Sequence, residues 1–468
     1  MTTQISLPLW IVLFLSLLSL WTIGHKILLP ILRNSLKKRE KSAVAQINKR
    51  LNLQLPPFKL TKRKIIIDRL LHDEKLRKDV KQYCRENKLE EDDTLEKVRF
   101  YAQEIVPSFN AYLYFKFGNL LSKLIVRLLY RIRVGFSYEE KLTKINPHSS
   151  IVFIMNHRSN MDYVLLGFLS FQRVALSFAV GEWARIWPLK QLISAMGAFF
   201  VRRGSKNPLY RIVLARYVQL ATKGGVVQAV YPEGRLSRDG FLAKPRLGIL
   251  DYMLREFNPD TDRDIVFIPV GVNYDRVLED RTLLQESAQK LKQKSRMKIM
   301  TTIMRYMIHS FGLRIRGDWH RFGYAIVNFG PPISMKDYSK THQIDFQGLN
   351  KDKRIETVKG LALDLLAAVG KVVPVAPVSL ISTVFTENPE KRYSELEIDA
   401  RVQALLHRLE KKKAHIYIPR SNWTYAIQVG LRMLILRHIV IKEDELFRAD
   451  PEEIKILRYY ANSIQHLL

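Results

Sequence analysis

The feature that most limits the fold of this chain is an alternation of β-rich runs with helix-length segments between residues 151 and 329. Segments of helical length, such as residues 163–169 and 210–223, separate several of the runs. Strands that alternate with helices are typical of crossover units with parallel strands. The sequence therefore predicts an α/β fold, with a mixed, mostly parallel sheet flanked by helices. The strand candidates are residues 151–155, 174–180, 198–201, 226–231, 265–272 and 324–329.

The amino-terminal stretch of residues 5–24 carries no charged side chain and consists mainly of Leu, Ile, Val, Phe and Trp. About 20 apolar residues suffice for a helix to cross the hydrocarbon core of a membrane. Eight basic residues follow between Lys26 and Arg50, against the single acidic residue Glu40. Such an excess marks the cytoplasmic side of a membrane span. We expect a membrane anchor, with a shorter helix lying in the membrane interface as the alternative.

Two further stretches of the chain show helical patterns, and together with the features above they divide the chain into four regions. Residues 109–136 have the pattern of a basic amphipathic helix, which suits a membrane surface and equally a core with one solvated face. The end of the chain contains segments of helical length at residues 355–369, 396–412, 422–441 and 451–468, with Pro374 and Pro377 interrupting between them. The expected regions are a membrane anchor (1–35), a helical N-terminal region (36–106), an α/β domain (107–350) and a helical C-terminal region (351–468).

The charge balance calls for a partner of opposite sign. Lys and Arg number 76 against 45 Asp and Glu, which gives a formal net charge of +31 at pH 7. Nucleic acid, an anionic membrane and phosphorylated small molecules all fit such a surplus, and composition alone does not choose among them. The single cysteine, Cys84, excludes an internal disulfide framework and a cysteine-rich zinc site.

A histidine and an aspartate after the run 151–155 are candidates for acid–base chemistry. Asp162 comes five residues after His157, and five residues on an ideal helix differ by about 140°. The pair therefore meets only if His157 sits on the turn before a helix that contains Asp162. The carboxylate then holds one imidazole nitrogen while the other accepts a proton. The alternative is a structural histidine beside a helix-capping aspartate.

Three further blocks stand at or near the ends of β-rich runs, where the sites of α/β sheets collect. Arg202 and Arg203 follow the run at 198–201. A turn of Pro, Gly and charged residues, containing Glu233, follows the run at 226–231. Pro269 interrupts the run at 265–272, and a proline suits a sheet edge, a bulge or a strand end.

These four blocks, in this order, resemble those of the glycerolipid acyltransferase superfamily. Arg158, directly after the histidine, is similar to the branch that acylates glycerol 3-phosphate and dihydroxyacetone phosphate. Residues 373–380 and 459–466 also resemble blocks near the end of the bacterial glycerol-3-phosphate acyltransferases, which are considerably longer than this chain. Leu236 departs from the resemblance, because it stands in a normally polar stretch of the third block.

The resemblance implies a role for each block. The first supplies the catalytic pair, with His157 as the base and Asp162 fixing its tautomer. The second and third bind the phosphorylated acceptor, for which arginine forks have suitable geometry. The fourth helps to shape the acyl-donor site, through Ile268, Pro269 and Val270. The expected acceptor-binding residues are Arg158, Arg202, Arg203, Glu233, Gly234, Arg235, Ser237, Arg238 and Arg246.

The function implied by the resemblance is that of a glycerol-3-phosphate 1-O-acyltransferase in phospholipid biosynthesis, which moves an acyl chain from acyl-CoA or an acyl carrier protein to the sn-1 hydroxyl. The alternatives are dihydroxyacetone phosphate or a lysophospholipid as acceptor, and a non-enzymatic basic protein that binds membrane surfaces. We expect no metal, no cofactor beyond this co-substrate, and no nucleic acid. Anionic membrane lipid is an expected partner. The expected location is the bacterial inner membrane, with the catalytic domain on the cytoplasmic side.

Overall fold

The computed structural model describes residues 56–170, 174–181, 185, 187, 189–202, 204–288 and 322–468. The expected membrane anchor, residues 1–35, lies outside the described residues and stays a prediction. Among the helices that the structure does describe, none is both long and apolar enough to cross a membrane.

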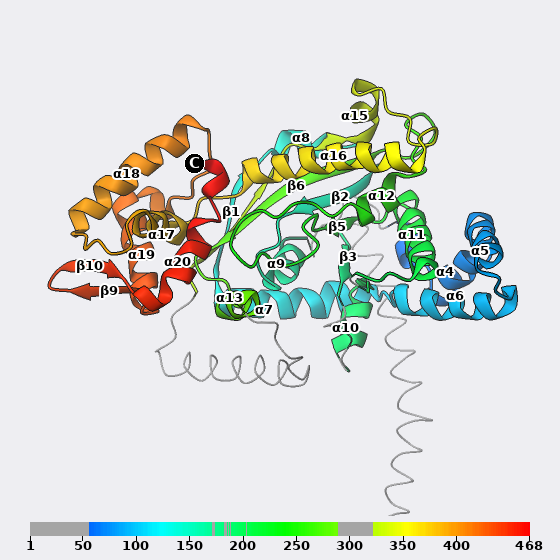
Figure 1. Ribbon diagram of the computed structural model, residues 1–468, viewed down its shortest axis with the longest axis horizontal. Coiled ribbons are helices and arrows are strands. Elements are labelled where there is room, and N and C mark those ends of the chain that lie inside the picture. Colours follow the sequence, from blue (N-terminus) through cyan, green and yellow to red (C-terminus); the bar gives the residue numbers. More distant parts are fainter. Residues whose placement is uncertain are drawn as a thin grey trace, which may run out of the picture.

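Within the described residues, an eight-stranded sheet forms the centre of the molecule (Figure 1). Its order is β1-β7-β6-β2-β5-β3-β4, with the short β8 paired to β6. β2 pairs in parallel with β5 and β6, whereas β7 and β8 run antiparallel to β6. The predicted α/β fold with a mixed, mostly parallel sheet is confirmed. The strands are β1 (Arg131–Ser137), β2 (Ser150–Met155), β3 (Ser177–Val180), β4 (Phe199–Phe200), β5 (Gln228–Val230), β6 (Ile265–Tyr274), β7 (Tyr324–Phe329) and β8 (Ile333–Ser334).

Helices cover both faces of this sheet, because successive side chains of its strands point to opposite faces. Val152 and Ile154 of β2 face a core with α11, α12 and α16, whereas Ile151 and Met155 face a core with α7 and α9. Figure 1 shows α16 along one side of the sheet and α7 and α9 along the other. The helices of this part are α3 (Pro57–Leu60), α4 (Arg63–Leu71), α5 (Glu74–Asn87), α6 (Glu91–Ile105), α7 (Asn119–Leu129), α8 (Glu139–Thr143), α9 (Met161–Ser170), α10 (Leu189–Ala195), α11 (Pro208–Lys223), α12 (Gly248–Leu254), α13 (Asp280–Ala288), α15 (Met335–Thr341) and α16 (Lys351–Val372).

The residues that follow α16 pack against the end of the sheet (Figure 1). At the centre of this region is α17 (Pro377–Glu387), most of whose residues are buried, in contact with α18 (Glu395–Lys411), α19 (Trp423–Ile435) and α20 (Ile454–Ala461). A hairpin of β9 (Val440–Glu443) and β10 (Leu446–Ala449) joins α19 to α20.

A buried carboxyl, Asp275, ties the sheet to this region. It follows β6 and accepts hydrogen bonds from the backbone N–H groups of Tyr324 in β7, at 2.7 Å, and of Val378 in the first turn of α17, at 3.2 Å. Burial raises the pKa of Asp275 to about 7. Two elements from separate parts of the sequence are therefore fixed by one side chain.

Three expectations about helices were wrong. Residues 109–136 do not form one helix: α7 ends at Leu129, and β1 follows as an edge strand beside β7. Residues 422–441 divide into α19 and β9, because a turn with His438 at φ 55° separates them. Pro377 does not interrupt helical structure but starts α17 at its first position, where a proline fits without loss of a hydrogen bond.

Candidate active site

The candidate base, His157, lies just after the end of β2. The Asn156 side chain donates a hydrogen bond to the carbonyl oxygen of Val272 (2.9 Å) and accepts one from the Val272 N–H (2.8 Å). These two bonds fix the end of β2 to the neighbouring β6. His157 therefore begins the turn to α9 from a rigid position at the carboxyl end of the parallel strands, where sites in such sheets collect.

His157 and Asp162 form a buried pair. The Nδ1 of His157 lies 2.9 Å from Oδ2 of Asp162, and the side chains are 1% and 0% exposed. Asp162 stands in the first turn of α9, and His157 stands on the turn before it, which is the geometry that the spacing required. The Asp162 carboxylate also accepts hydrogen bonds from the backbone N–H groups of Arg158 (2.8 Å) and Ser159 (3.1 Å). Because a carboxylate only accepts, Nδ1 carries the proton and Nε2 is the basic nitrogen.

Two tyrosines surround the imidazole. The Tyr231 ring stacks on it, with centroids 4.0 Å apart, and the Tyr163 hydroxyl lies 3.4 Å from Nε2. Burial raises the pKa of the Tyr231 hydroxyl well above its ordinary value. That hydroxyl is buried, and the described chain offers it no hydrogen-bond partner. Both residues lie inside the blocks that the sequence singled out, but their roles had not been assigned.

The loop after β5 is attached to the histidine from both sides. Glu233 accepts hydrogen bonds from the backbone N–H groups of His157 and Ala243, each at 2.9 Å, and the Ser237 N–H donates to the His157 carbonyl oxygen at 2.9 Å. Burial raises the pKa of Glu233 to about 7. Gly234 has φ +68°, and a Cβ there would lie 2.7 Å from Cδ of Arg246. A larger residue at this position would meet both a strained φ and the Arg246 side chain, so glycine suits the close approach.

Arg158 is a buried cation with unused hydrogen-bonding capacity. It is 3% exposed, its Nη1 donates to the Gly240 carbonyl oxygen at 2.6 Å, and its guanidinium lies 4.7 Å from the Tyr459 ring centroid in α20. Its Nε and Nη2 are buried, and no described residue accepts a hydrogen bond from either. Buried donors without partners are costly, so these two nitrogens suit an anionic group of a ligand.

The other expected acceptor-binding residues lie in different surroundings. The guanidinium of Arg202 makes two hydrogen bonds to Glu104 of α6, at 2.8 and 2.6 Å, and is thereby engaged within the protein. Ser237 accepts a hydrogen bond from the Gly240 N–H and donates to Phe241, as a turn residue does. Arg203 lies outside the described residues. Arg235, Arg238 and Arg246 are exposed on the loop that carries Glu233 or just beyond it.

The residues expected to shape the acyl-donor site are buried in β6. Ile268 and Val270 belong to the core beneath the sheet. Pro269 lies between the stretch of β6 that pairs with β8 and the stretch that pairs with β7, where its missing N–H is tolerated. No described contact links their side chains to His157, so their role stays a prediction.

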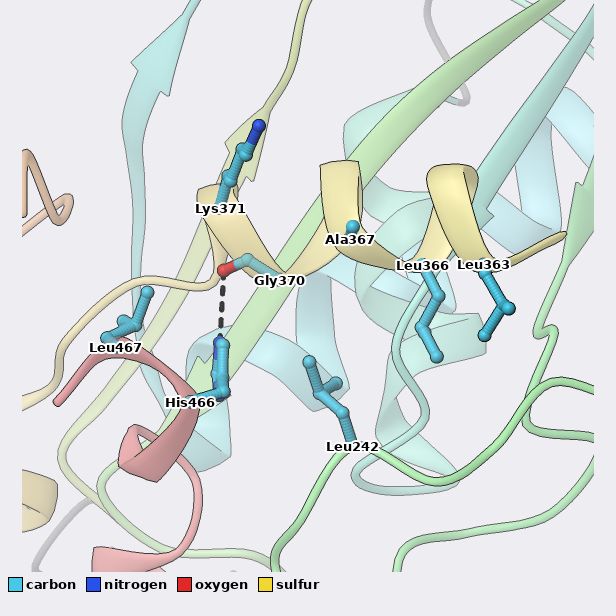
Figure 2. Close-up of a pocket in the computed structure, with 8 residues that line it drawn as sticks. All are labelled: Leu242, Leu363, Leu366, Ala367, Gly370, Lys371, His466 and Leu467. Carbon is cyan, nitrogen blue, oxygen red and sulfur yellow. Dashed lines mark hydrogen bonds between the residues drawn. The ribbon is translucent and has the colours of Figure 1, made fainter. Parts of the chain in front are cut away.

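An apolar groove of about 390 Å³ lies between α16, the C-terminal residues and the loop that follows Glu233. Figure 2 shows Leu363 and Leu366 of α16 pointing toward Leu242, with His466 hydrogen-bonded to the Gly370 carbonyl oxygen at 3.0 Å. Leu242 directly precedes Ala243, whose N–H donates to Glu233. The groove is therefore connected to the His157 site through one loop.

Two further residues that contact the pair or its turn escaped the sequence analysis. The Tyr274 hydroxyl, from the end of β6, donates to Oδ1 of Asp162 at 2.6 Å. Glu279 accepts a hydrogen bond from the Ser159 hydroxyl at 2.7 Å, and burial raises its pKa. The available signal was positional: Tyr274 ends β6 and Glu279 follows it, and the carboxyl end of β6 lies beside that of β2.

Two parts of the chain match known families. Residues 135–273 match the acyltransferase family, and residues 314–468 match the glycerol-3-phosphate acyltransferase C-terminal region.

Similar curated proteins include the glycerol-3-phosphate acyltransferases of three bacteria. Those of Xylella fastidiosa (strain M23) and Alteromonas mediterranea are each 25% identical to this chain over 426 residues, and that of Pseudomonas aeruginosa (strain LESB58) is 26% identical over 420 residues. Each alignment covers 87% of this chain, but 47%, 50% and 49% of the respective relative. The chain thus spans about half the length of the curated relatives it matches.

Proposed function

The chain belongs to the glycerol-3-phosphate acyltransferase family, and from this membership we propose that it transfers an acyl chain from a thioester donor to the sn-1 hydroxyl of glycerol 3-phosphate. One observation carries the proposal: the buried base His157 is followed in the chain by a buried cation, Arg158, whose Nε and Nη2 have no partner in the described chain. Acylation of a phosphorylated alcohol needs both groups at one place, the base for the hydroxyl and the cation for the phosphate.

In the proposed reaction, Nε2 of His157 takes the proton of the substrate hydroxyl as its oxygen attacks the carbonyl carbon of the thioester. A C–O bond forms and the C–S bond breaks, and the sulfur leaves with the proton from the imidazolium. Asp162 holds the Nδ1–H and stabilises the imidazolium while it exists. Because the substrate hydroxyl is itself the nucleophile, the chemistry needs no acyl-enzyme intermediate.

The phosphate is proposed to bind through Nε and Nη2 of Arg158. The exposed arginines Arg235, Arg238 and Arg246 add positive potential on or just beyond the loop that carries Glu233 and attract a phosphorylated acceptor. The donor is proposed to be acyl-CoA or acyl carrier protein, without another cofactor or a metal. The groove in Figure 2 is the candidate place for the acyl chain, because it is apolar and adjoins the Glu233 loop.

We further propose that the protein works at an anionic membrane surface, the inner face of a bacterial inner membrane. Phe117, Leu120 and Leu124, at helical spacing, are 44%, 68% and 57% exposed. They are flanked by Lys116 and Arg127, also exposed, and no acidic residue lies between Lys116 and Arg127. We call this surface the α7 face. Exposed apolar side chains among cations fit a layer of anionic lipid.

The test is acyl transfer by the purified full chain with labelled acyl-CoA, offered glycerol 3-phosphate, dihydroxyacetone phosphate and lysophosphatidate in competition. We expect glycerol 3-phosphate to be acylated preferentially. His157→Ala should lower kcat about 10³-fold, since general-base catalysis contributes about 10²–10⁴. The exposed His72→Ala serves as the matched control and should leave the rate unchanged.

Other outcomes separate the alternatives. Preferential acylation of dihydroxyacetone phosphate or lysophosphatidate would show that this compound is the acceptor, with His157 still acting as the base. Full activity of His157→Ala would remove His157 as the base. No transfer to any acceptor from any donor, with intact binding to anionic vesicles, would favour the non-enzymatic alternative.

A further inference from the structure

The Asp162 carboxylate has a hydrogen-bond donor that its own turn does not supply. Oδ2 faces His157 and two backbone N–H groups of the turn, whereas Oδ1 accepts from the Tyr274 hydroxyl at 2.6 Å. Tyr274 is the last residue of β6 and is fully buried. It stands just beyond residue 273, where the match to the acyltransferase family ends.

We infer that Tyr274 is a positioning residue, which acts on His157 through Asp162. The inference rests on the proposed function, because it assumes that His157 is the base. A donor on Oδ1 fixes the rotation of the carboxylate about its Cβ–Cγ bond, and this keeps Oδ2 directed at Nδ1. The same donor disperses the negative charge of the carboxylate and so limits how strongly it attracts a proton on the imidazole.

The surroundings keep Tyr274 in this role. Its ring packs against Tyr130, with centroids 5.3 Å apart, so the hydroxyl has a fixed direction. Burial raises the pKa of the Tyr274 hydroxyl well above its ordinary value, and it remains a donor at any physiological pH. The other titratable groups facing the pair are unchanged when only this hydroxyl is removed. They are Arg158, Tyr163, Tyr231, Glu233, Glu279 and Tyr459.

The experiment compares Tyr274→Phe with Tyr130→Phe. Tyr130 supplies a matched control, because it is an adjacent, equally buried tyrosine whose hydroxyl donates to the Arg276 carbonyl oxygen, at 2.9 Å, and not to Asp162. For Tyr274→Phe we expect kcat to fall about tenfold, with KM for glycerol 3-phosphate unchanged, since a hydrogen bond to a charged group is worth about this factor. The acid limb of the pH–rate profile should move to higher pH, because the less dispersed carboxylate holds the imidazolium proton more tightly. Tyr130→Phe should change neither quantity.

A second measurement, the titration of the His157 imidazole by NMR, does not depend on the substrate. In protein with ¹⁵N-labelled histidine, the imidazole titration of His157, assigned among the 11 histidines by its loss in His157→Ala, should move to higher pH in Tyr274→Phe and not in Tyr130→Phe. If Tyr274→Phe fails to fold, 3-fluorotyrosine placed at residue 274 alone gives the opposite test, because its more acidic hydroxyl is a stronger donor. The His157 titration and the acid limb should then move to lower pH.

The possible results separate the two hypotheses. Equal His157 titrations and equal acid limbs in Tyr274→Phe and Tyr130→Phe would overturn the positioning role. A shifted His157 titration in a protein that acylates none of the offered acceptors would keep the positioning role and reject the proposed function.

Discussion

At the scale of single residues, two arginines that looked equivalent in the sequence have different environments. Arg158 is buried, and its Nε and Nη2 have no partner within the described chain. Arg202 is paired with Glu104 through two hydrogen bonds. An anionic ligand can accept hydrogen bonds from Arg158 without displacing another group. To accept them from Arg202, it must first displace the Glu104 carboxylate.

We therefore predict that Arg158→Lys raises KM for glycerol 3-phosphate by roughly 10- to 100-fold, because lysine lacks the fork that reaches a phosphate with two donors. Arg202→Lys should leave this KM within about twofold. The measurement is initial rates at saturating acyl donor. An equal rise of KM in both variants would show that the pairing with Glu104 does not remove Arg202 from the binding site.

The sequence predicted the His157–Asp162 pair because the two residues are five positions apart, at the boundary between a strand and a helix. It did not predict the partners of Asp162 and Arg202. Tyr274 lies 112 residues from Asp162, and Glu104 lies 98 residues from Arg202. Contacts over such separations depend on strand order and helix packing, which leave no local pattern.

At the scale of elements, Gly240 is the point where the Glu233 loop meets α20. A Cβ at Gly240 would lie 2.0 Å from the carbonyl oxygen of Tyr459, and φ there is +92°. Tyr459 is also the residue whose ring stacks on Arg158. The close contact between the loop at Gly240 and α20 therefore determines the position of the Arg158 guanidinium.

We predict that Gly240→Ala lowers the free energy of unfolding by about 3 kcal/mol, because it adds both a steric overlap and a strained φ, and that it also raises KM for glycerol 3-phosphate. Gly248→Ala is the control: it has no atom within 4 Å of the added Cβ and no positive φ. It should be neutral or slightly stabilising. Urea unfolding of both variants checks the prediction, and equal stability of the two would contradict it.

The strands that the sequence predicted well are continuous runs of apolar, β-prone residues. The runs at 151–155, 226–231 and 265–272 correspond to β2, β5 and β6. β1 was missed because its charged residues, Arg131 and Arg133, alternate with apolar ones on an edge strand that follows directly on α7. α17 was missed because it is buried on nearly all sides, so its residues show no polar face.

At the scale of the whole molecule, two properties favour binding to an anionic membrane. The chain has a surplus of 31 positive charges, and the α7 face exposes apolar side chains. We predict that binding to vesicles of anionic phospholipid weakens as salt rises, because screening acts on exposed charges. The double variant Leu120→Asp/Leu124→Asp should weaken binding at least about tenfold, since each leucine contributes its apolar area.

The control for this prediction is Leu396→Asp, an 83% exposed leucine on the distant α18. It should leave vesicle binding unchanged, as measured by cosedimentation of the full chain. Equal binding by all variants would show that the α7 face does not contact the membrane.

The folding of this chain is coupled to the protonation of two buried carboxyls, Glu233 and Asp275. Their ordinary pKa values are 4.5 and 3.8, and in the folded protein both rise to about 7. At pH 6 the unfolded chain has released both of these protons while the folded chain keeps most of both, so these two groups together take up nearly two protons on folding. The stabilising effect of these groups is complete below about pH 4 and falls by about 1.4 kcal/mol per group and pH unit until it is lost near pH 7. When the protein unfolds at pH 6, these two carboxyls therefore release nearly two protons, and calorimetry in two buffers of different ionisation heat measures the total release to which they contribute.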